Sequence, residues 1–227
     1  MLASTIERAR EFLQSAAPNE RILSVSQMDY PGFASWCTCA ECGAVDEAEG
    51  SHSGTIVRFV NAVAAALESD FPDALIETFA YMHSRKPPAR TRPRDNVLIR
   101  VCAIEADYGR PLRDRRSDAN RAFVRDLKTW RRITNHVYVW DYTQNWWAFQ
   151  APHPNVHVLQ PNLAFYKRVG VDGVFEQASP YASNSDVEPL KTYLFGRGLR
   201  DPNFDWRTAY GEFLDHYYGP AAPQIDE

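Results

Sequence analysis

The chain alternates short β-branched runs with longer segments whose apolar residues recur at helical spacing. The runs that read as strands lie at 22–27, 74–81, 96–104, 136–142 and 172–177. The segments at 54–72 and 117–133 have the apolar periodicity of helices that bury one face. Strands that alternate with helices are typical of a parallel sheet, because a crossover helix carries the chain back to where the previous strand began. We therefore predict an α/β protein.

Length and charge narrow the class of protein further. The 227 residues suffice for one large domain, and no internal repeat or linker interrupts them, so we predict a single domain over residues 1–227. The net charge is −4, and the basic run at 85–94 holds three prolines typical of a loop, so we expect no nucleic-acid surface. No apolar stretch is long enough for a membrane span, and early charges interrupt any signal-peptide core.

Acidic, amide and aromatic residues follow each predicted strand. In chain order they are Gln27 and Asp29, Tyr81 and His83, Glu105 and Asp107, Asp141 and Tyr142, and Glu176 and Gln177. Loops that follow parallel strands converge on one side of a sheet, so these side chains are expected to meet in one site. Each acid taken alone is more often a helix cap or an ion-pair partner. The recurrence of polar or aromatic side chains at every strand end favours a shared site.

The end of the fourth predicted strand adds aromatic rings to these polar groups. Trp140, Asp141 and Tyr142 end the strand, and Asn145 and Trp146 follow in the loop. Unpaired polar groups are costly to bury, so a packed core has no need of an acid and an amide there. Aromatic faces beside hydrogen-bonding groups suit a sugar ring, which has apolar C–H faces and hydroxyl edges. A Trp-rich packing cluster with solvated polar neighbours is the alternative.

Motifs for several other chemistries are absent from the sequence. No G-x-G-x-x-G follows a predicted strand and no G-x-x-x-x-G-K-[ST] occurs, so we expect no nucleotide and no other cofactor. The serine-hydrolase motif G-x-S-x-G is absent too. The acids, amides and aromatics at the strand ends therefore indicate a carbohydrate-active site, with a glycan or oligosaccharide as partner.

Cysteines are crowded into one short segment, C-x-C-x-x-C, at Cys37, Cys39 and Cys42. These thiols and the nearby His52 are the ligand types of a zinc site. The spacing lacks the paired C-x-x-C motifs of zinc ribbons, however. Packing in a loop, or a disulfide from Cys42 to Cys39 or Cys37, is the favoured alternative. We therefore predict no metal, with these residues as the ligands if one binds.

Segments along nearly the whole chain resemble one bacterial family. They include the Ser-Val-Ser-Gln strand that reaches Asp29, the C-x-C-x-x-C segment, the Ala-Tyr before a Pro-Pro turn, and Trp-Asp-Tyr at 140–142. This pattern is similar to that of the domain-of-unknown-function family 4838. Its members include glycoside hydrolase family 163, endo-β-N-acetylglucosaminidases that act on N-glycans. The resemblance implies a (β/α)₈ TIM-barrel-type glycosidase fold, of which this chain has the C-terminal five β/α units.

A partial barrel has consequences for assembly. An open barrel leaves strand edges and part of its core exposed to water. We therefore expect the missing N-terminal half-barrel to come from a longer chain or a partner, or this chain to associate with itself and to be poorly stable alone. The resemblance also implies export, to the periplasm or outside the cell, if a longer form exists.

The resemblance also implies a chemistry. A glycosidase needs an acid that protonates the leaving oxygen, and a 2-acetamido sugar can supply its own nucleophile. We predict Glu105 as this acid, because the preceding apolar strand would give it partly apolar surroundings. Asp29 is predicted to orient or stabilise the sugar, and Asp141 and Glu176 to contact hydroxyls or take a second catalytic role. The residues predicted to line sugar subsites are Gln27, Tyr81, Trp140, Tyr142, Asn145, Trp146 and Gln177.

Two interpretations from other classes stay open. The first is a sugar-binding module without catalysis, which we expect if the missing strands of the barrel carry residues essential for catalysis. A metal or thiol protein centred on Cys37 to Cys42 is the other possibility, and elemental analysis of the purified protein distinguishes it.

Overall fold

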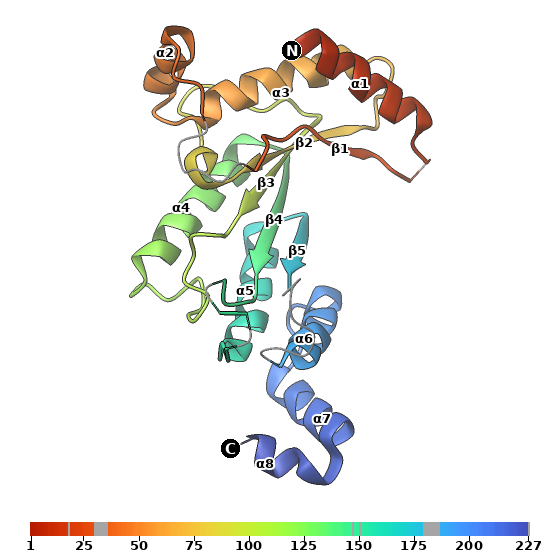
Figure 1. The fold of residues 1–227 in the computed structure, drawn as a ribbon, viewed down its shortest axis with the longest axis vertical. Coiled ribbons are helices and arrows are strands. Elements are labelled where there is room, and N and C mark those ends of the chain that lie inside the picture. The colour runs from red at the N-terminus through yellow and green to blue at the C-terminus, as the bar shows by residue number, and fades with distance from the viewer. Residues whose placement is uncertain (18, 30–35, 147, 150, 179–186, 227) are drawn as a thin grey trace. The chain divides into compact units, whose positions relative to one another are not determined.

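The fold is taken from a computed structural model, with its helices and strands labelled in Figure 1. The structure describes all residues except 18, 30–35, 147, 150, 179–186 and 227. The chain divides into two compact units, each built from several segments. The N-terminal unit comprises residues 1–104, 125–140 and 171–173, and the C-terminal unit comprises residues 105–124, 141–170 and 174–227.

One sheet of five strands has the order β1-β2-β3-β4-β5. The strands are β1 (Ile22–Ser24), β2 (Leu75–Ala80), β3 (Val97–Cys102), β4 (His136–Tyr142) and β5 (Gly173–Gln177). The pairs from β1 to β4 are parallel. The predicted α/β class with a parallel sheet is confirmed, and strands that follow one another in chain order fit part of a β/α barrel.

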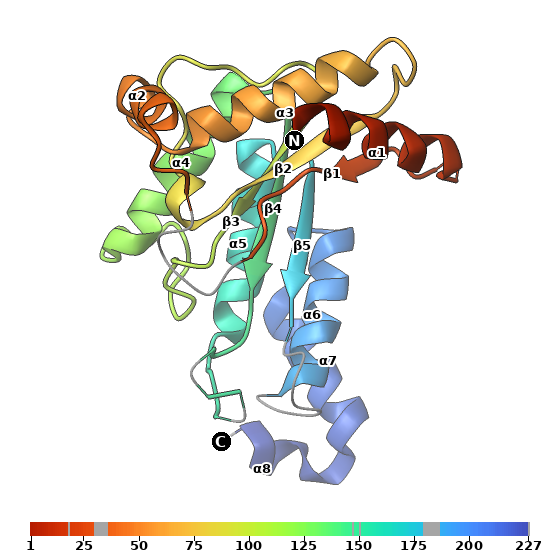
Figure 2. The same cartoon turned by 45° about the horizontal axis from the view of Figure 1, so that its top comes forward.

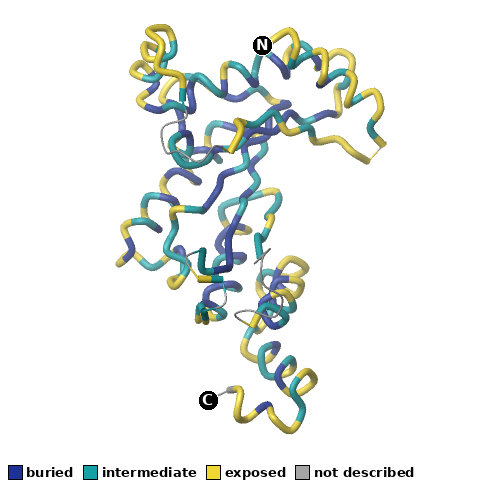
Figure 3. Tube along the Cα trace, in the orientation of Figure 1, coloured by how far each residue is buried: buried dark blue, intermediate teal, exposed yellow. Residues whose placement is uncertain are grey.

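Burial differs between the middle and the ends of this strand order (Figure 3). Val97, Leu98 and Ile99 of β3 are consecutive and all are at most 1% exposed. Consecutive buried residues are typical of an interior parallel strand, because both faces of the strand are covered. β1 and β5 have no fully buried residue. The core of the sheet is therefore centred on β3 and its neighbours.

Helices of the N-terminal unit form two layers on the sheet. α3 (Ser53–Leu67) packs on β2 and β3, and α1 (Leu2–Ser15) and α2 (Ala40–Glu49) pack on α3. Figure 2 shows α1 alongside α3. The buried residues of α3 include Val60, Val63 and Leu67. These positions have the spacing that the sequence predicted for a helix with one apolar face.

α2 lies where the sequence predicted a loop. The helix has no apolar stripe, and its one buried side chain is Glu49. Its ends are capped instead: the Sγ of Cys39 accepts the N–H of Cys42, and Gly50 ends the helix at φ 60°. Glycine adopts this left-handed conformation without steric cost. The helix was missed because capping, rather than apolar periodicity, defines it.

The remaining helices belong mainly to the C-terminal unit. Only α4 (Asp118–Ile133) continues into the N-terminal unit. In the C-terminal unit α5 packs on α6, α6 on α7, and α7 on α8. Their bounds are α5 (Val156–Val169), α6 (Glu188–Arg200), α7 (Trp206–Tyr218) and α8 (Ala222–Asp226). A short 3₁₀ turn, η2 (Gly219–Ala221), joins α7 to α8, and another, η1 (Met82–Ser84), follows β2 in the N-terminal unit. Among the described residues, no helix has the length and apolar content that crossing a bilayer requires.

Candidate functional site

Asp141, near the end of β4, is a buried, hydrogen-bonded acid of the C-terminal unit. It is 6% exposed. Its Oδ2 accepts the hydroxyl of Tyr166 at 2.7 Å, and its Oδ1 accepts the backbone N–H of Tyr142 at 2.9 Å. Burial raises the pKa of Asp141 to about 6, although both hydrogen bonds favour the ionised form. Asp141 therefore titrates close to neutral pH.

Glu176 of β5 is the second acid; the residue is half-buried, but one of its carboxyl oxygens is buried. Its Oε2 has no exposed surface and, among the described residues, no hydrogen-bond partner. The pKa of Glu176 is raised well above its usual range; burial is the larger cause and the negative charge of Asp141 is the smaller one. The same two causes raise the pKa of Tyr166. Burial therefore favours the protonated form of both carboxyl groups, and the charge of Asp141 adds to this effect at Glu176.

A small cavity adjoins both carboxyl groups. It has a volume of about 10 Å³, which is room for about one water molecule. Its lining includes Asp141, Glu176, Asn155, Tyr108 and Tyr142. The Oδ1 of Asn155 is also buried without a partner in the described part of the chain. The Glu176 Oε2 and the Asn155 Oδ1, both without a hydrogen-bond partner among the described residues, thus belong to residues that line one cavity the size of a water molecule.

An aromatic cluster adjoins this cavity through Tyr108 and Tyr142, which line it. The ring of Tyr142 lies 6.0 Å from that of Tyr108 and 5.8 Å from that of Trp146, between centroids. Trp146 in turn contacts Phe149 edge to face at 5.8 Å. Tyr142 and Trp146, both predicted to line sugar subsites, thus lie in an aromatic cluster next to the carboxyl pair.

The backbone beyond β4 is held by buried polar side chains. The Thr143 carbonyl accepts from the Asn155 side-chain amide at 3.1 Å and from the Lys191 Nζ at 3.2 Å. Lys191 also donates to the carbonyl of His153 at 3.1 Å. In β5, the carbonyl of Gln177 accepts the N–H of Thr143 at 3.2 Å. These bonds fix the strand ends that carry the two acids.

A second group of side chains lies on one face of the sheet in the N-terminal unit. Arg100 of β3 pairs with Glu77 of β2, with Nε 3.0 Å from Oε2. The guanidinium carbon lies 5.6 Å from the ring centre of Tyr138 and 5.7 Å from that of Trp140. The ring of Phe79 contacts Trp140 edge to face at 5.5 Å. Half-buried aromatic rings and a charged pair therefore share this face.

Trp140 and Asp141 have different neighbours, each within its own unit. Trp140 lies with Arg100 on the sheet face, whereas Asp141 bonds to Tyr166 of α5. Successive side chains of a strand point to opposite faces, so neighbours in sequence are separated here. The predicted place of Trp140 in a sugar subsite and the predicted role of Asp141 both stay predictions.

Strand-end residues of the N-terminal unit form a separate polar group. The Nε2 of His83 lies 3.0 Å from the Oε1 of Gln27. The ring of Trp36 stacks on His52 at 4.3 Å and lies 5.3 Å from His83. Burial and the charge of His52 lower the pKa of His83. Gln27 thus lies beside His83, which follows β2.

The other predicted residues have less distinctive surroundings. Asp29 and Glu105 are exposed, so the apolar surroundings that the sequence suggested for Glu105 are absent, because it lies in the loop beyond β3. Its role as the acid stays a prediction. Tyr81 caps η1, with its N–H donated to Ser84 Oγ at 3.1 Å. Asn145 is half-buried.

Several residues at these sites escaped the sequence interpretation. Tyr166 was missed because an isolated Tyr in an apolar helix is usually a packing residue. Glu77 and Arg100 carried a usable signal: each is a single charge inside an apolar strand. Opposite charges at such positions of neighbouring strands predict a cross-strand pair.

The three clustered cysteines are the candidate metal ligands of the N-terminal unit. The sulfur atoms of Cys37, Cys39 and Cys42 all lie within 4.8 Å of one another, and all four cysteines are free thiols. His52 is not part of this group, since its Nδ1 lies 2.6 Å from Asp46 Oδ2.

A much larger groove of about 1130 Å³ lies elsewhere in the C-terminal unit, along α7 and α8. Its lining is mainly apolar, with Trp206, Tyr210 and Tyr218, and its one acid is Asp215. It shares no lining residue with the cavity at Asp141 and Glu176. Size alone does not supply acid–base chemistry, so we take the smaller cavity as the candidate catalytic site.

Comparison with known proteins gives the family. No curated protein and no solved structure matches the sequence. The family model that matches is described as a domain of unknown function, DUF4838, and it covers residues 2–227. The chain therefore belongs to the DUF4838 family.

Proposed function

We propose that this chain acts on glycans as a glycoside hydrolase-like domain, with β-linked N-acetylglucosamine glycans as the substrate class. The observation that supports this proposal is the pair of Asp141 and Glu176 at one small cavity, where burial raises the pKa of both carboxyl groups. Glycoside hydrolysis uses a pair of carboxyl groups, one of which keeps its proton because its pKa is raised. The resemblance to family 163 endo-β-N-acetylglucosaminidases supports the choice of sugar.

The two carboxyl groups would take different roles. Glu176, kept protonated, would give its proton to the glycosidic oxygen as the bond to the anomeric carbon breaks. The acetamido oxygen of the substrate would bond to that carbon, and the Asp141 carboxylate would stabilise the positive charge that develops. Water would then add, returning a proton to Glu176. Tyr166, bonded to Asp141, would hold the carboxylate in place.

Access to the pair requires movement. The cavity has room for about one water molecule, so a sugar ring reaches the carboxyl groups only when the surrounding side chains separate. Tyr108 and Tyr142 line the cavity, and the segment that carries Tyr108 contains no helix or strand. Separation of these two rings would open the site.

The test is turnover of an N-glycan by the purified chain, with product sugars identified by mass. Glu176→Gln keeps the shape of the side chain but removes its transferable proton, so the rate is expected to fall by roughly 10²–10⁴-fold. Glu212→Gln is the matched control, because Glu212 is exposed on α7, where it pairs with Arg197. Equal loss in both variants, or full activity in Glu176→Gln, would remove the pair from the mechanism.

Glycan binding without turnover is the second candidate. The specific observation that favours it is the half-buried face of Arg100, Tyr138 and Trp140, since aromatic rings and a guanidinium offer stacking and hydrogen bonds to a sugar. This role would be supported, and hydrolysis contradicted, if the chain bound glycans but released no product. The binding should then be lost in Trp140→Ala and kept in Glu176→Gln.

A further inference from the structure

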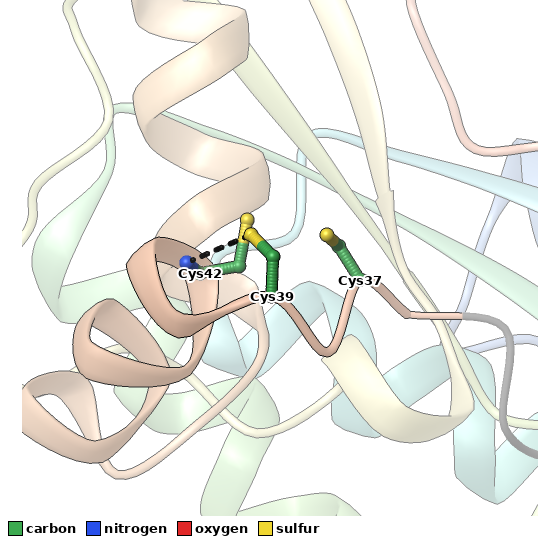
Figure 4. Close-up of side chains that lie close together, drawn as sticks. All are labelled: Cys37, Cys39 and Cys42. Atoms are coloured by element: carbon green, nitrogen blue, oxygen red, sulfur yellow. Dashed lines mark hydrogen bonds between the residues drawn. The ribbon is translucent and has the colours of Figure 1, made fainter.

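Three thiols converge at the start of α2, in a part of the N-terminal unit that the proposed glycan chemistry does not use. Figure 4 shows the sulfur atoms of Cys37, Cys39 and Cys42 directed to the same side of the chain. They lie within 4.8 Å of one another. Cys37 and Cys39 are exposed and Cys42 is half-buried, so an ion from solvent can reach the group.

Local backbone structure explains this convergence. Cys39 is the N-cap of α2, with extended φ and ψ of −64° and 157°. Residues two apart in an extended segment point to the same side, which brings Cys37 toward Cys39. The first turn of the helix then brings Cys42 back to the cap, where its N–H donates to the Cys39 sulfur at 3.5 Å. The C-x-C-x-x-C spacing thus produces a three-sulfur cluster.

Charge in the same segment favours a cation. Between Trp36 and Gly50 the sequence has four acidic residues and no Lys or Arg. Thiolates placed within 4.8 Å of one another repel, and no basic residue of this segment offsets that repulsion. A bound metal ion does offset it, because each thiolate then faces a positive charge.

We propose that Cys37, Cys39 and Cys42 bind one Zn²⁺ ion, with the fourth position open to water or an external ligand. Sulfurs bound at about 2.3 Å to a tetrahedral ion are about 3.8 Å apart, so the thiols need to close by no more than about 1 Å. His52 does not complete the site, because it is held by Asp46 and stacked on Trp36. Binding converts three thiols to thiolates and releases their protons, so affinity rises with pH.

Zinc binding by the reduced 227-residue chain tests the proposal. The protein is incubated with Zn²⁺ alone, dialysed, and analysed for zinc; Co²⁺ is then used as a spectroscopic probe of thiolate ligation. We expect one zinc per chain and a sulfur-to-cobalt charge-transfer band. Each of Cys37→Ser, Cys39→Ser and Cys42→Ser is expected to weaken affinity by at least about 100-fold, since changes outside the first ligand shell already cost 10–100-fold.

Matched variants make the result decisive. Cys102→Ala removes the fourth cysteine, which is buried in β3, and is expected to leave zinc binding unchanged. His52→Ala is expected to leave zinc binding unchanged too. If that variant lost zinc binding, His52 would be the fourth ligand and the fourth position would not be open. Absence of bound zinc, or equal loss in Cys102→Ala, would overturn the site. A thiol titration of the untreated protein that finds two free thiols instead of four would show a disulfide in its place.

Discussion

Tyr166 on α5 donates its hydroxyl to Asp141 at the end of β4, with the two oxygen atoms 2.7 Å apart. Both side chains are buried, and Glu176 of β5 raises the pKa of the same Tyr166 hydroxyl. A helix and two neighbouring strands therefore contribute to one buried ionisable cluster. Such clusters are costly to keep in a core, which makes them candidates for function.

Removing this hydroxyl should change the titration of Asp141. Tyr166→Phe deletes the hydrogen bond that favours the ionised carboxylate, so the pKa of Asp141 is expected to rise above its present value of about 6. Above that pH the variant should lose about 1.5–3 kcal/mol of stability, the contribution of a hydrogen bond to a charged group. Carbon chemical shifts of the Asp141 carboxyl group over a pH series measure the first effect. Tyr193→Phe, which removes an exposed hydroxyl bonded to Glu212, is the control and should leave Asp141 unchanged.

The carboxyl pair should also make stability fall as pH rises. In the unfolded chain Asp141 and Glu176 titrate near 3.8 and 4.5, whereas both pKa values are raised in the folded protein, that of Asp141 to about 6. At pH values between the unfolded and the folded pKa, the folded state binds more protons than the unfolded state. The free energy of unfolding therefore decreases as pH rises from about 4 through 6. Glu176→Gln removes one ionisation and should stabilise the protein at pH 8 by on the order of 1–3 kcal/mol, with no gain near pH 4. Urea unfolding at both pH values measures this; a gain that is equal at both would contradict it.

Sequence patterns predicted the sheet well because the signal is local. Each strand run is β-branched and apolar, and each is followed by a helix or a turn, so class and strand positions follow from periodicity. α2 was missed for the opposite reason: its capping by Cys39 and Gly50 leaves no apolar stripe to detect.

The candidate site was predicted only in part. Asp141 and Glu176 were selected because they end strands, and both line the small cavity. Their partner Tyr166 comes from a helix, and no spacing rule connects it to either acid. Glu105 was favoured for its apolar strand, but exposure depends on how the loop beyond β3 turns, which composition does not encode.

A different buried acid, Glu49 at the end of α2, should have the opposite pH dependence. Its carboxylate accepts the N–H groups of Arg90 at 2.8 Å and Thr91 at 3.0 Å, and Arg58 donates to it at 3.0 Å. Although burial opposes ionisation, these bonds lower the pKa of Glu49 to about 2, so its stabilisation is present above pH 4.5 and lost as pH falls toward 2. Glu49→Gln should cost roughly 1–3 kcal/mol at pH 7, because a buried donor loses its acceptor. Glu47→Gln, at an exposed neighbouring position, should be nearly neutral, and thermal melts of both variants at pH 7 compare them.

Leaving-group dependence separates Glu176 from Glu105 as the acid. A natural glycan needs a proton on the departing oxygen, whereas an activated aryl glycoside leaves without one, so loss of the true acid slows the first substrate far more than the second. Glu176→Gln should therefore lose roughly 10²–10⁴-fold on the glycan and little on the aryl substrate. Asp141→Asn should slow both substrates, because charge at the anomeric carbon develops in either case. Glu105→Gln, at an exposed position, should leave both rates near wild type. If Glu105→Gln instead shows the selective loss and Glu176→Gln does not, the exposed acid performs the chemistry and the buried pair has only a structural role.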